Sequence, residues 1–241
     1  FLDAHAPGRG VRMRLVKRIP MGAGLGGGSS DAAATVVAID RLYGLGISRT
    51  KMAAVGGKIG SDVNFFFNGG TALCRGRGEQ VAGVYFPYRA AFHYVLLTPG
   101  THVSTAEVYK RVGGIPLLRW IENRDQPRER FEAHLEQTGE ALLGHTQMVM
   151  ALTMGDVGGV AARLKNRLEP VTLALYPELQ PFKEALQAEG LAALMSGSGS
   201  SFYGLAPTRE KAVEAASRLE TRFPGKVRVL SGGGEPDYVW M

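Results

Sequence analysis

Apolar side chains follow two different periods along the first part of the chain. From Val11 to Ile19, apolar and basic residues alternate over most of the length, which is the period of a half-buried strand. After a glycine-rich stretch, apolar residues recur with helical spacing from Ala32 to Tyr43, and Gly44 follows as a stop signal. The sequence therefore predicts a strand, a glycine loop and a helix in succession.

Beyond this group, the pattern predicts shorter helices and strands that alternate without a regular repeat length. Helices are predicted at 49–57, 105–112, 177–189 and 209–222, with two or three pieces over 129–168, and strands at 71–75, 91–98, 191–195, 201–205 and 227–230. This irregular order favours an α+β fold with a mostly antiparallel sheet over a solenoid. Pro87 separates the two halves, so we predict domains at 1–87 and 88–241.

The composition is that of an ordinary globular protein. Of the 241 residues, 45% are hydrophobic and 21% charged, so a sizeable core can be buried. The one cysteine, Cys74, cannot form an internal disulfide, and the five histidines never fall at zinc-ligand spacing. No apolar run is long enough to cross a bilayer, and Phe1–Gly10 lacks the features of a signal peptide. We expect a soluble, cytoplasmic protein with no membrane partner.

The net charge of +6 favours anionic partners. However, the densest basic stretch, Arg119–Arg130, also contains acidic residues and reads as a solvated surface. A basic stripe with interleaved aromatic residues, typical of nucleic-acid binding, is not found. The charge therefore predicts small anionic ligands and no nucleic-acid partner.

The segment Pro20-Met-Gly-Ala-Gly-Leu-Gly-Gly-Gly-Ser-Ser30 is the strongest chemical signal. Glycines let successive backbone amides turn inward without Cβ clashes, and a helix that starts near Ser30 adds its unpaired amides and the positive end of its dipole. This combination predicts a polyphosphate cradle. It is neither a Walker A loop, which continues with Gly-Lys-Ser/Thr, nor a dinucleotide loop with GxGxxG spacing. The alternative is a flexible linker in which Ser30 only caps the helix.

Two segments resemble the GHMP kinases, which include galactokinase, homoserine kinase, mevalonate kinase and phosphomevalonate kinase. Pro20 to Ala33 looks like the second motif of that family, and Leu194-Met-Ser-Gly-Ser-Gly-Ser-Ser-Phe202 looks like its third. The triple glycine before Ser29, the segment Gly60-Ser-Asp-Val63 and the element Gly76-Arg-Gly-Glu79 are similar to one branch. That branch uses ATP to phosphorylate the 2-hydroxyl of 4-diphosphocytidyl-2-C-methyl-D-erythritol in non-mevalonate isoprenoid biosynthesis.

The resemblance implies a fold and a set of ligands. The fold would be the two-domain α+β GHMP kinase fold, with a ribosomal protein S5 domain 2-like N-terminal domain, truncated here, and a ferredoxin-like C-terminal domain. ATP is the implied co-substrate and Mg²⁺ the counter-charge, with its protein ligands unknown; the assembly would be a monomer or homodimer. The residues assigned to ATP are Pro20, Met21, Gly22, Ala23, Gly24, Leu25, Gly26, Gly27, Gly28, Ser29, Ser30, Ser198 and Gly199.

Asp62 falls on the catalytic aspartate of the family. Its implied role is to orient the substrate hydroxyl and to take its proton as the O–P bond forms, while the loop amides and Mg²⁺ hold the γ-phosphoryl group. Taken alone, an aspartate before an apolar run is more often a helix or turn cap. Asn64 stands where the family usually has proline.

Thr105 and Tyr109 are the residues that the resemblance assigns to the substrate. Thr105 would contact it, and Tyr109 would cover one face of the cytosine. The alternative is a capped helix in which Ser104 or Thr105 is the N-cap and Tyr109 packs inward.

The turn Met195–Ser201 joins two strand-like runs, so a tight hairpin explains it without any ligand. The resemblance places this turn beside the phosphate loop, in a supporting role. Asn166 and Glu169 match an Asn-x-x-Glu feature of the family, although a polar pair at a helix end explains them equally well.

The resemblance also places family residues before Val11, where nothing in this sequence matches them. They are a lysine that pairs with the catalytic aspartate, a nearby asparagine, and a Tyr-His pair that binds the cytosine. Lys17 and Lys58 are explained as surface lysines, so we expect a fragment of a longer kinase. Two alternatives stay open: another GHMP kinase acting on homoserine or a mevalonate derivative, and a catalytically inactive nucleotide-binding relative.

Overall fold

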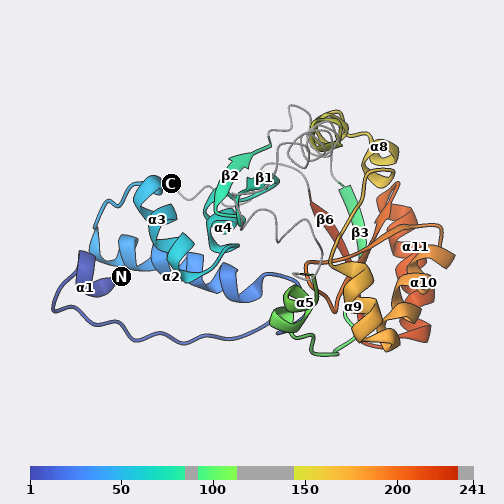
Figure 1. The fold of residues 1–241 in the computed structure, drawn as a ribbon, viewed down its shortest axis with the longest axis horizontal. Helices are drawn as coiled ribbons and strands as arrows, with labels where there is room; N and C mark the ends of the chain where they lie inside the picture. The colour runs from blue at the N-terminus through green and yellow to red at the C-terminus, as the bar shows by residue number, and fades with distance from the viewer. Residues whose placement is uncertain (85–91, 113–143, 233–241) are drawn as a thin grey trace, which may run out of the picture. The chain divides into compact units, whose positions relative to one another are not determined.

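The computed structural model describes residues 1–84, 92–112 and 144–232, which form two compact units (Figure 1). The first unit holds residues 1–21 and 26–84. The second unit holds Gly22–Leu25 together with 92–112 and 144–232. The boundary at Pro87 lies outside the described residues, so the division into 1–87 and 88–241 stays a prediction.

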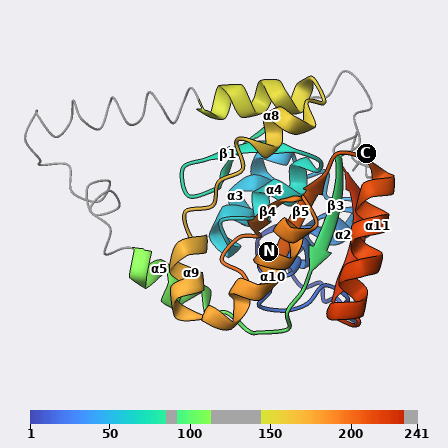
Figure 2. The ribbon, with the colours of Figure 1, turned by 90° about the vertical axis from the view of Figure 1, so that its right-hand side faces the viewer.

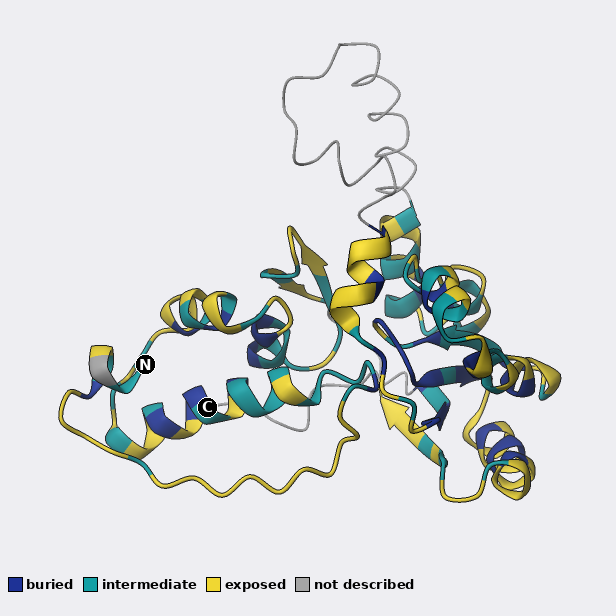
Figure 3. Ribbon diagram, turned by 60° about the horizontal axis from the view of Figure 1, so that its bottom comes forward, coloured by how far each residue is buried: buried dark blue, intermediate teal, exposed yellow. Residues whose placement is uncertain are grey.

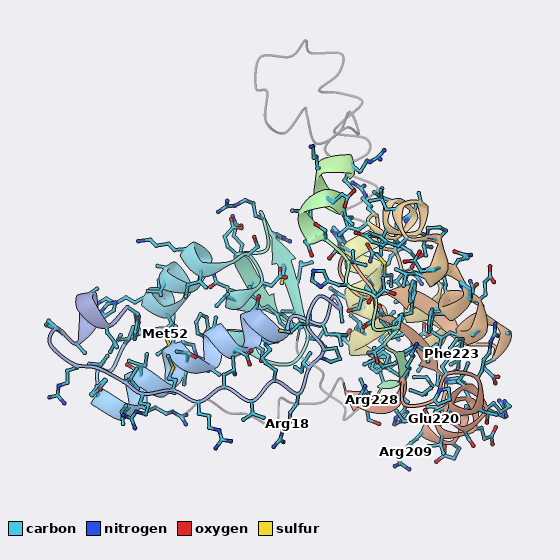
Figure 4. All side chains as sticks on the ribbon, turned by 90° about the horizontal axis from the view of Figure 1, so that it is seen from below. Arg18, Met52, Arg209, Glu220, Phe223 and Arg228 are labelled. Carbon is cyan, nitrogen blue, oxygen red and sulfur yellow. The ribbon has the colours of Figure 1, made fainter. Side chains whose placement is uncertain are left out.

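Helices dominate the first unit. They are α1 (Leu2–His5), α2 (Gly27–Tyr43), α3 (Arg49–Ile59) and α4 (Val63–Asn68). An antiparallel hairpin of β1 (Ala72–Arg75) and β2 (Gln80–Gly83) follows them. The small core of this unit is made by Ala33, Val36 and Val37 of α2, Met52 of α3, and Val63 and Phe67 of α4. Of these residues, Met52 is labelled in Figure 4.

The ends of α2 and α3 follow from local chemistry. Gly44, the C-cap of α2, has a φ of 60°, and the next amide, of Leu45, donates to Asp40 O at 3.0 Å. Glycine adopts this left-handed conformation without a Cβ penalty, so the predicted stop is confirmed. The Ser48 hydroxyl accepts from the amide of Lys51 at 3.4 Å and begins α3.

The predicted strand at Val11–Ile19 is wrong, because the structure has no strand there. Met13 and Val16 are each 61% exposed, and the segment follows an exposed path (Figure 3). A strand needs a neighbouring strand to complete its backbone hydrogen bonds, and no described strand pairs with this segment. The alternation of apolar and basic residues indicated the side-chain period of a strand, but it carries no information on whether a neighbouring strand is present.

A four-stranded antiparallel sheet organises the second unit, in the order β4-β5-β3-β6. The strands are β3 (Phe92–Leu97), β4 (Ala192–Met195), β5 (Phe202–Ala206) and β6 (Val227–Gly232). In the central strand, Val95 lies opposite Gly204 of β5 and Val229 of β6. This strand order is ferredoxin-like, and the predicted α+β fold with a mostly antiparallel sheet is confirmed.

Helices cover this sheet, and α11 runs alongside β3 (Figure 2). The helices are α5 (Thr105–Val112), α8 (Val157–Ala161), α9 (Glu169–Leu175), the 3₁₀ turn η1 (Pro177–Leu179), α10 (Gln180–Ala188) and α11 (Arg209–Arg222). Residues 144–153 are also helical, and the earlier part of the predicted helix at 129–168 lies outside the described residues. The core includes Leu97, Leu186 and Phe202, which have no exposed surface. Among the described helices, none is both long and apolar enough to span a bilayer.

Candidate functional site

Helix α2 begins at Gly27, three residues before the predicted start near Ser30. Gly26 is its N-cap, with a φ of 64°, and the amide of Ser30 donates to Gly26 O at 2.9 Å. The first-turn amides of Gly27, Gly28 and Ser29 have no intrahelical acceptor and carry the positive end of the helix dipole. The end of the glycine loop is therefore an ordered helix start with unpaired amides rather than a flexible linker in which Ser30 is the cap.

The loop residues Gly22–Leu25 belong to the second unit, where their carbonyl groups are occupied. Gly22 O accepts from Val103 N at 3.4 Å, and Ala23 O accepts from Ser201 N at 3.1 Å. Gly24 O accepts from the Ser196 hydroxyl at 2.8 Å. By contrast, the amides of Gly24 and Leu25 donate to no described residue. The loop thus keeps donors available while its acceptors are bound, which suits an anionic ligand.

Gly24 must be glycine for two independent reasons. Its φ is +71°, and an added Cβ would lie 2.0 Å from Ser196 O. A real carbon atom does not approach a backbone oxygen so closely, so any side chain would push the loop away from the turn. The glycine therefore allows the two backbones to touch.

Three hydrogen-bond donors fix the backbone of the turn Ser196–Ser201. They are the Asn166 side chain, the Thr172 hydroxyl and the amide of Gly199 within the turn. The Asn166 amide donates to Met195 O at 2.8 Å and to Gly197 O at 2.7 Å. Thr172 Oγ1 donates to Ser198 O at 3.1 Å, and Gly199 N donates to Ser196 O at 2.9 Å. The turn joins β4 to β5, so the predicted hairpin is confirmed, but its loop is fixed by distant side chains.

Ser198 and Thr105 are brought together within the second unit. Their hydroxyl oxygens lie 2.8 Å apart, at the start of α5. Ser104, not Thr105, caps this helix, because its hydroxyl accepts from Glu107 N at 3.3 Å. Tyr109 follows one turn after Thr105 and is 54% exposed, so the alternative in which Tyr109 packs inward is wrong. Thr105 and Tyr109 therefore both remain available to a ligand.

Asp62 immediately precedes α4 in the first unit, and its side chain makes no cap hydrogen bond. The residue is exposed and has no ion-pair partner in the described part of the chain. A Cβ on Gly78 would lie 3.6 Å from Asp62 Oδ1, so the β1–β2 turn lies beside this carboxylate. Partial burial of its sulfur and, second, the charge of Asp62 raise the pKa of the Cys74 thiol. Asp62 is thus an exposed carboxylate without an ion-pair partner among the described residues.

The helix that follows Asp62 packs against the start of α2. A Cβ on Gly26 would lie 2.9 Å from Phe66 Cζ, so the Phe66 ring touches the helix cap. Asn64, where the family usually has proline, is 6% exposed and donates from Nδ2 to Glu79 O at 3.0 Å. This asparagine ties α4 to the β1–β2 hairpin, a contact that the sequence pattern did not predict.

Two further side chains, Lys17 and His102, lie beside the glycine-rich segment. Lys17 pairs with Asp31 in the first turn of α2, and its Nζ lies 3.8 Å from the position of a Cβ on Gly27. The His102 ring packs on Gly22, because a Cβ there would lie 2.1 Å from Nδ1. Sequence reasoning treated Lys17 as a surface lysine and did not single out His102, since neither contact has a periodic signature.

Glu169 anchors the turn from inside the second unit. It is 6% exposed, accepts from Met195 N at 2.8 Å, and forms an ion pair with Lys183. The sequence explained it equally well as a helix-terminal polar residue; Glu169 is indeed the first residue of α9, and its carboxylate also binds the end of β4.

Comparisons with known proteins agree along the chain. Residues 1–70 match the GHMP kinases N terminal domain, and residues 148–225 match GHMP kinases C terminal. The 4-diphosphocytidyl-2-C-methyl-D-erythritol kinase of Moorella thermoacetica is 40% identical over 89% of this chain and 68% of its own length. The enzyme of the same name from Heliobacterium modesticaldum is 41% identical over 92% of this chain and 68% of its own length.

Solved structures support the same assignment. A crystal structure of a 4-(cytidine 5'-diphospho)-2C-methyl-D-erythritol kinase aligns with a TM-score of 0.66 and 34% identity, over 96% of this chain and 73% of that one. Homoserine kinase from Cytophaga hutchinsonii shares the fold, with a TM-score of 0.64 at 20% identity, over 90% of this chain and 67% of that one. Because both halves match the family's domains and the chain covers more than two thirds of relatives about 40% identical to it, the chain belongs to the GHMP kinase family.

Proposed function

We propose that this protein transfers the γ-phosphoryl group of ATP to the 2-hydroxyl of 4-diphosphocytidyl-2-C-methyl-D-erythritol, a step of non-mevalonate isoprenoid biosynthesis. The observation that carries the proposal is the glycine loop, in which the carbonyls of Gly22, Ala23 and Gly24 are all bound inside the protein. The choice of this acceptor alcohol rests on the names of the relatives. A cytoplasmic location is part of the same proposal.

The polyphosphate of ATP is held by main-chain donors in this proposal. The first-turn amides of α2 from Gly27 to Ser29, together with those of Gly24 and Leu25, supply hydrogen bonds to phosphate oxygens. Pro20 and Met21 lead into the loop, and Ser198 and Gly199 complete the nucleotide site. Within each unit the backbone already fixes these donors, so they need little local reorganisation to stabilise developing negative charge.

Asp62 acts on the acceptor alcohol. Its unpaired carboxylate accepts a hydrogen bond from the 2-hydroxyl and orients the oxygen for in-line attack on the γ-phosphorus. As the O–P bond forms and the bond to the β-phosphate breaks, the proton moves to the carboxylate. The exposure of Asp62 leaves room for a substrate beside it.

Thr105 and Tyr109 bind the other end of the acceptor. Thr105 lies at the start of α5, hydrogen-bonded to Ser198, and contacts the substrate from there. The exposed ring of Tyr109 offers an apolar face for the cytosine. A flat aromatic face tolerates any base, so selection of cytosine falls to hydrogen bonds at the edge of the ring.

Mg²⁺ neutralises phosphate charge when it is bound with ATP. No group of three His, Cys, Asp or Glu side chains that could hold a metal is found among the described residues. This fits a cation that takes most of its ligands from phosphate oxygens and water, and needs only one or two from the protein. The hydroxyls of Ser29 and Ser30, at the start of α2, are the candidates within the loop.

The decisive test is a substrate panel with protein expressed from the complete reading frame that contains this sequence. We expect ATP-dependent phosphorylation of 4-diphosphocytidyl-2-C-methyl-D-erythritol and none of mevalonate or homoserine. Asp62→Asn should lower kcat at least about 100-fold while the KM for ATP changes little. Phosphorylation of mevalonate or homoserine alone would defeat the choice of acceptor. An Asp62→Asn enzyme with wild-type kcat would remove Asp62 from the chemistry.

A further inference from the structure

In the turn Ser196–Ser201, the first backbone carbonyls are hydrogen-bonded within the protein, whereas several backbone amides are not. Its carbonyls from Ser196 to Ser198, and that of the preceding Met195, are all taken by other groups of the protein. The amides of Gly197, Ser198 and Ser200 donate to no residue of the described ranges. The amides of Gly197 and Ser198 are adjacent, and two adjacent free amides beside bound carbonyls attract phosphate oxygens, whereas a free carbonyl would repel them.

Asn166 binds two of these four carbonyls. Both of its amide hydrogens are used, one on Met195 O and the other on Gly197 O. Its own oxygen accepts from Leu168 N at 2.8 Å, which fixes the side chain at the start of α9. A single side-chain amide therefore binds two backbone carbonyls, one just before the turn and one within it.

The segment that carries Asn166 is itself fixed. Glu169, three residues later, is 6% exposed and binds Met195 N and Lys183. Thr172, one helical turn further, has no exposed surface and binds Ser198 O. Three side chains of one short segment thus contact the first part of the turn, from Met195 to Ser198, which is more than a hairpin needs to close.

We propose that Asn166 is a positioning residue for phosphate binding: by holding the carbonyls of Met195 and Gly197, it leaves the amides of Gly197 and Ser198 to bind a phosphate group of ATP or of the acceptor. This inference rests on the proposed function. Asn166 does not touch the reacting atoms; it acts through the backbone of the turn. Thr172 supports the same geometry at Ser198 O.

The kinetic test replaces Asn166 with leucine, which has a similar shape but no donors. We expect Asn166→Leu to raise the KM of one phosphate-bearing substrate about tenfold, as expected for two lost hydrogen bonds, with a smaller change in kcat. A rise for ATP alone assigns the turn to the nucleotide, and a rise for the diphosphate-bearing acceptor alone assigns it to the acceptor. Unchanged KM values for both substrates would overturn the proposal.

A binding test separates this inference from the proposed reaction. In the full-length protein labelled with ¹⁵N, sodium tripolyphosphate should shift the amide signals of Gly197 and Ser198, and Asn166→Leu should reduce the shifts. Thr172→Val should reduce them less, because it releases one carbonyl. Amide signals that do not respond to tripolyphosphate in the wild-type protein would overturn the inference even if the enzyme is active.

The matched control is Thr208→Val. Like Thr172→Val, it replaces a threonine hydroxyl with a methyl group within the second unit. The hydroxyl it removes is the N-cap of α11, which accepts from Lys211 N at 3.2 Å. If Thr208→Val reduces the phosphate-induced shifts as much as Thr172→Val does, the effect comes from general destabilisation and the proposal fails. A tripolyphosphate response that is intact in Thr208→Val and reduced in Thr172→Val and Asn166→Leu supports it.

Discussion

Gly24→Ala is the substitution whose outcome depends most directly on the geometry of the glycine loop. Two costs add at this position. The left-handed φ of +71° costs about 1–2 kcal/mol for a residue with a Cβ. In addition, the Cβ would lie 2.0 Å from Ser196 O, so the loop and the turn must separate.

Separation of loop and turn has a definable cost. It breaks the hydrogen bond from the Ser196 hydroxyl to Gly24 O, and the bond from Ser201 N to Ala23 O lies next to it. Losing buried hydrogen bonds of this kind costs about 1–3 kcal/mol. We therefore expect Gly24→Ala to lower the free energy of unfolding of the second unit by about 2–5 kcal/mol.

Gly225 provides the control for Gly24. It has nearly the same φ, +71°, in the second unit, but a Cβ there meets nothing within 4 Å. Gly225→Ala should therefore show the backbone cost alone, about 1–2 kcal/mol, and leave ATP binding unchanged.

The assay is urea unfolding together with calorimetric titration of a non-hydrolysable ATP analogue. Gly24→Ala should bind the analogue at least about tenfold more weakly, since the displaced loop loses its aligned donors. If both alanine variants lose the same stability and bind the analogue equally well, then loop and turn are not in contact as described.

Two further predictions concern the second unit. Glu169→Gln should lower the free energy of unfolding, measured in urea titrations, by about 3 kcal/mol. The reason is that Lys183, whose side chain is only 22% exposed, loses its ion-pair partner. A loss below about 0.5 kcal/mol would contradict this prediction. Burial, and then the charges of Tyr94 and Glu169, raise the pKa of Tyr203 to about 12. An unfolded tyrosine loses its proton near pH 10, so between about pH 10 and 12 the proton is lost only on unfolding, and stability should fall as the pH rises. Tyr203→Phe should remove this part of the pH dependence, which unfolding titrations at stepped pH can measure.

Local signals in the sequence were sufficient for α5 and α11, whereas α1, α4 and α9 were not predicted. Both α5 and α11 begin and end at the predicted residues, because an amphipathic period, a capping serine or threonine and basic final residues coincide there. The Val11–Ile19 segment shows the limit of the same reasoning. Its period is that of a strand, but pairing depends on a partner far away in sequence.

Some parts of the candidate site could likewise be predicted from the sequence, and others could not. Repeated glycines and serines marked the loop and the turn, since these residue types have few other uses in such density. The roles of Asn166 and Thr172 could not be predicted, because each reaches the turn across more than twenty positions of sequence, from 26 to 31. Asn64 was likewise visible only as a departure from the family pattern, whereas its buried contact with Glu79 depends on tertiary structure.

The bound carbonyls of Gly22, Ala23 and Gly24 have a consequence for inhibitor design. A compound that carries amines or hydroxyls toward this stretch finds few acceptors left to bind. Sulfonate, phosphonate or tetrazole groups, which accept hydrogen bonds and carry negative charge, match the remaining amides. Screening libraries chosen for such acidic head groups should therefore yield more competitive ligands of this protein than libraries of basic, drug-like compounds.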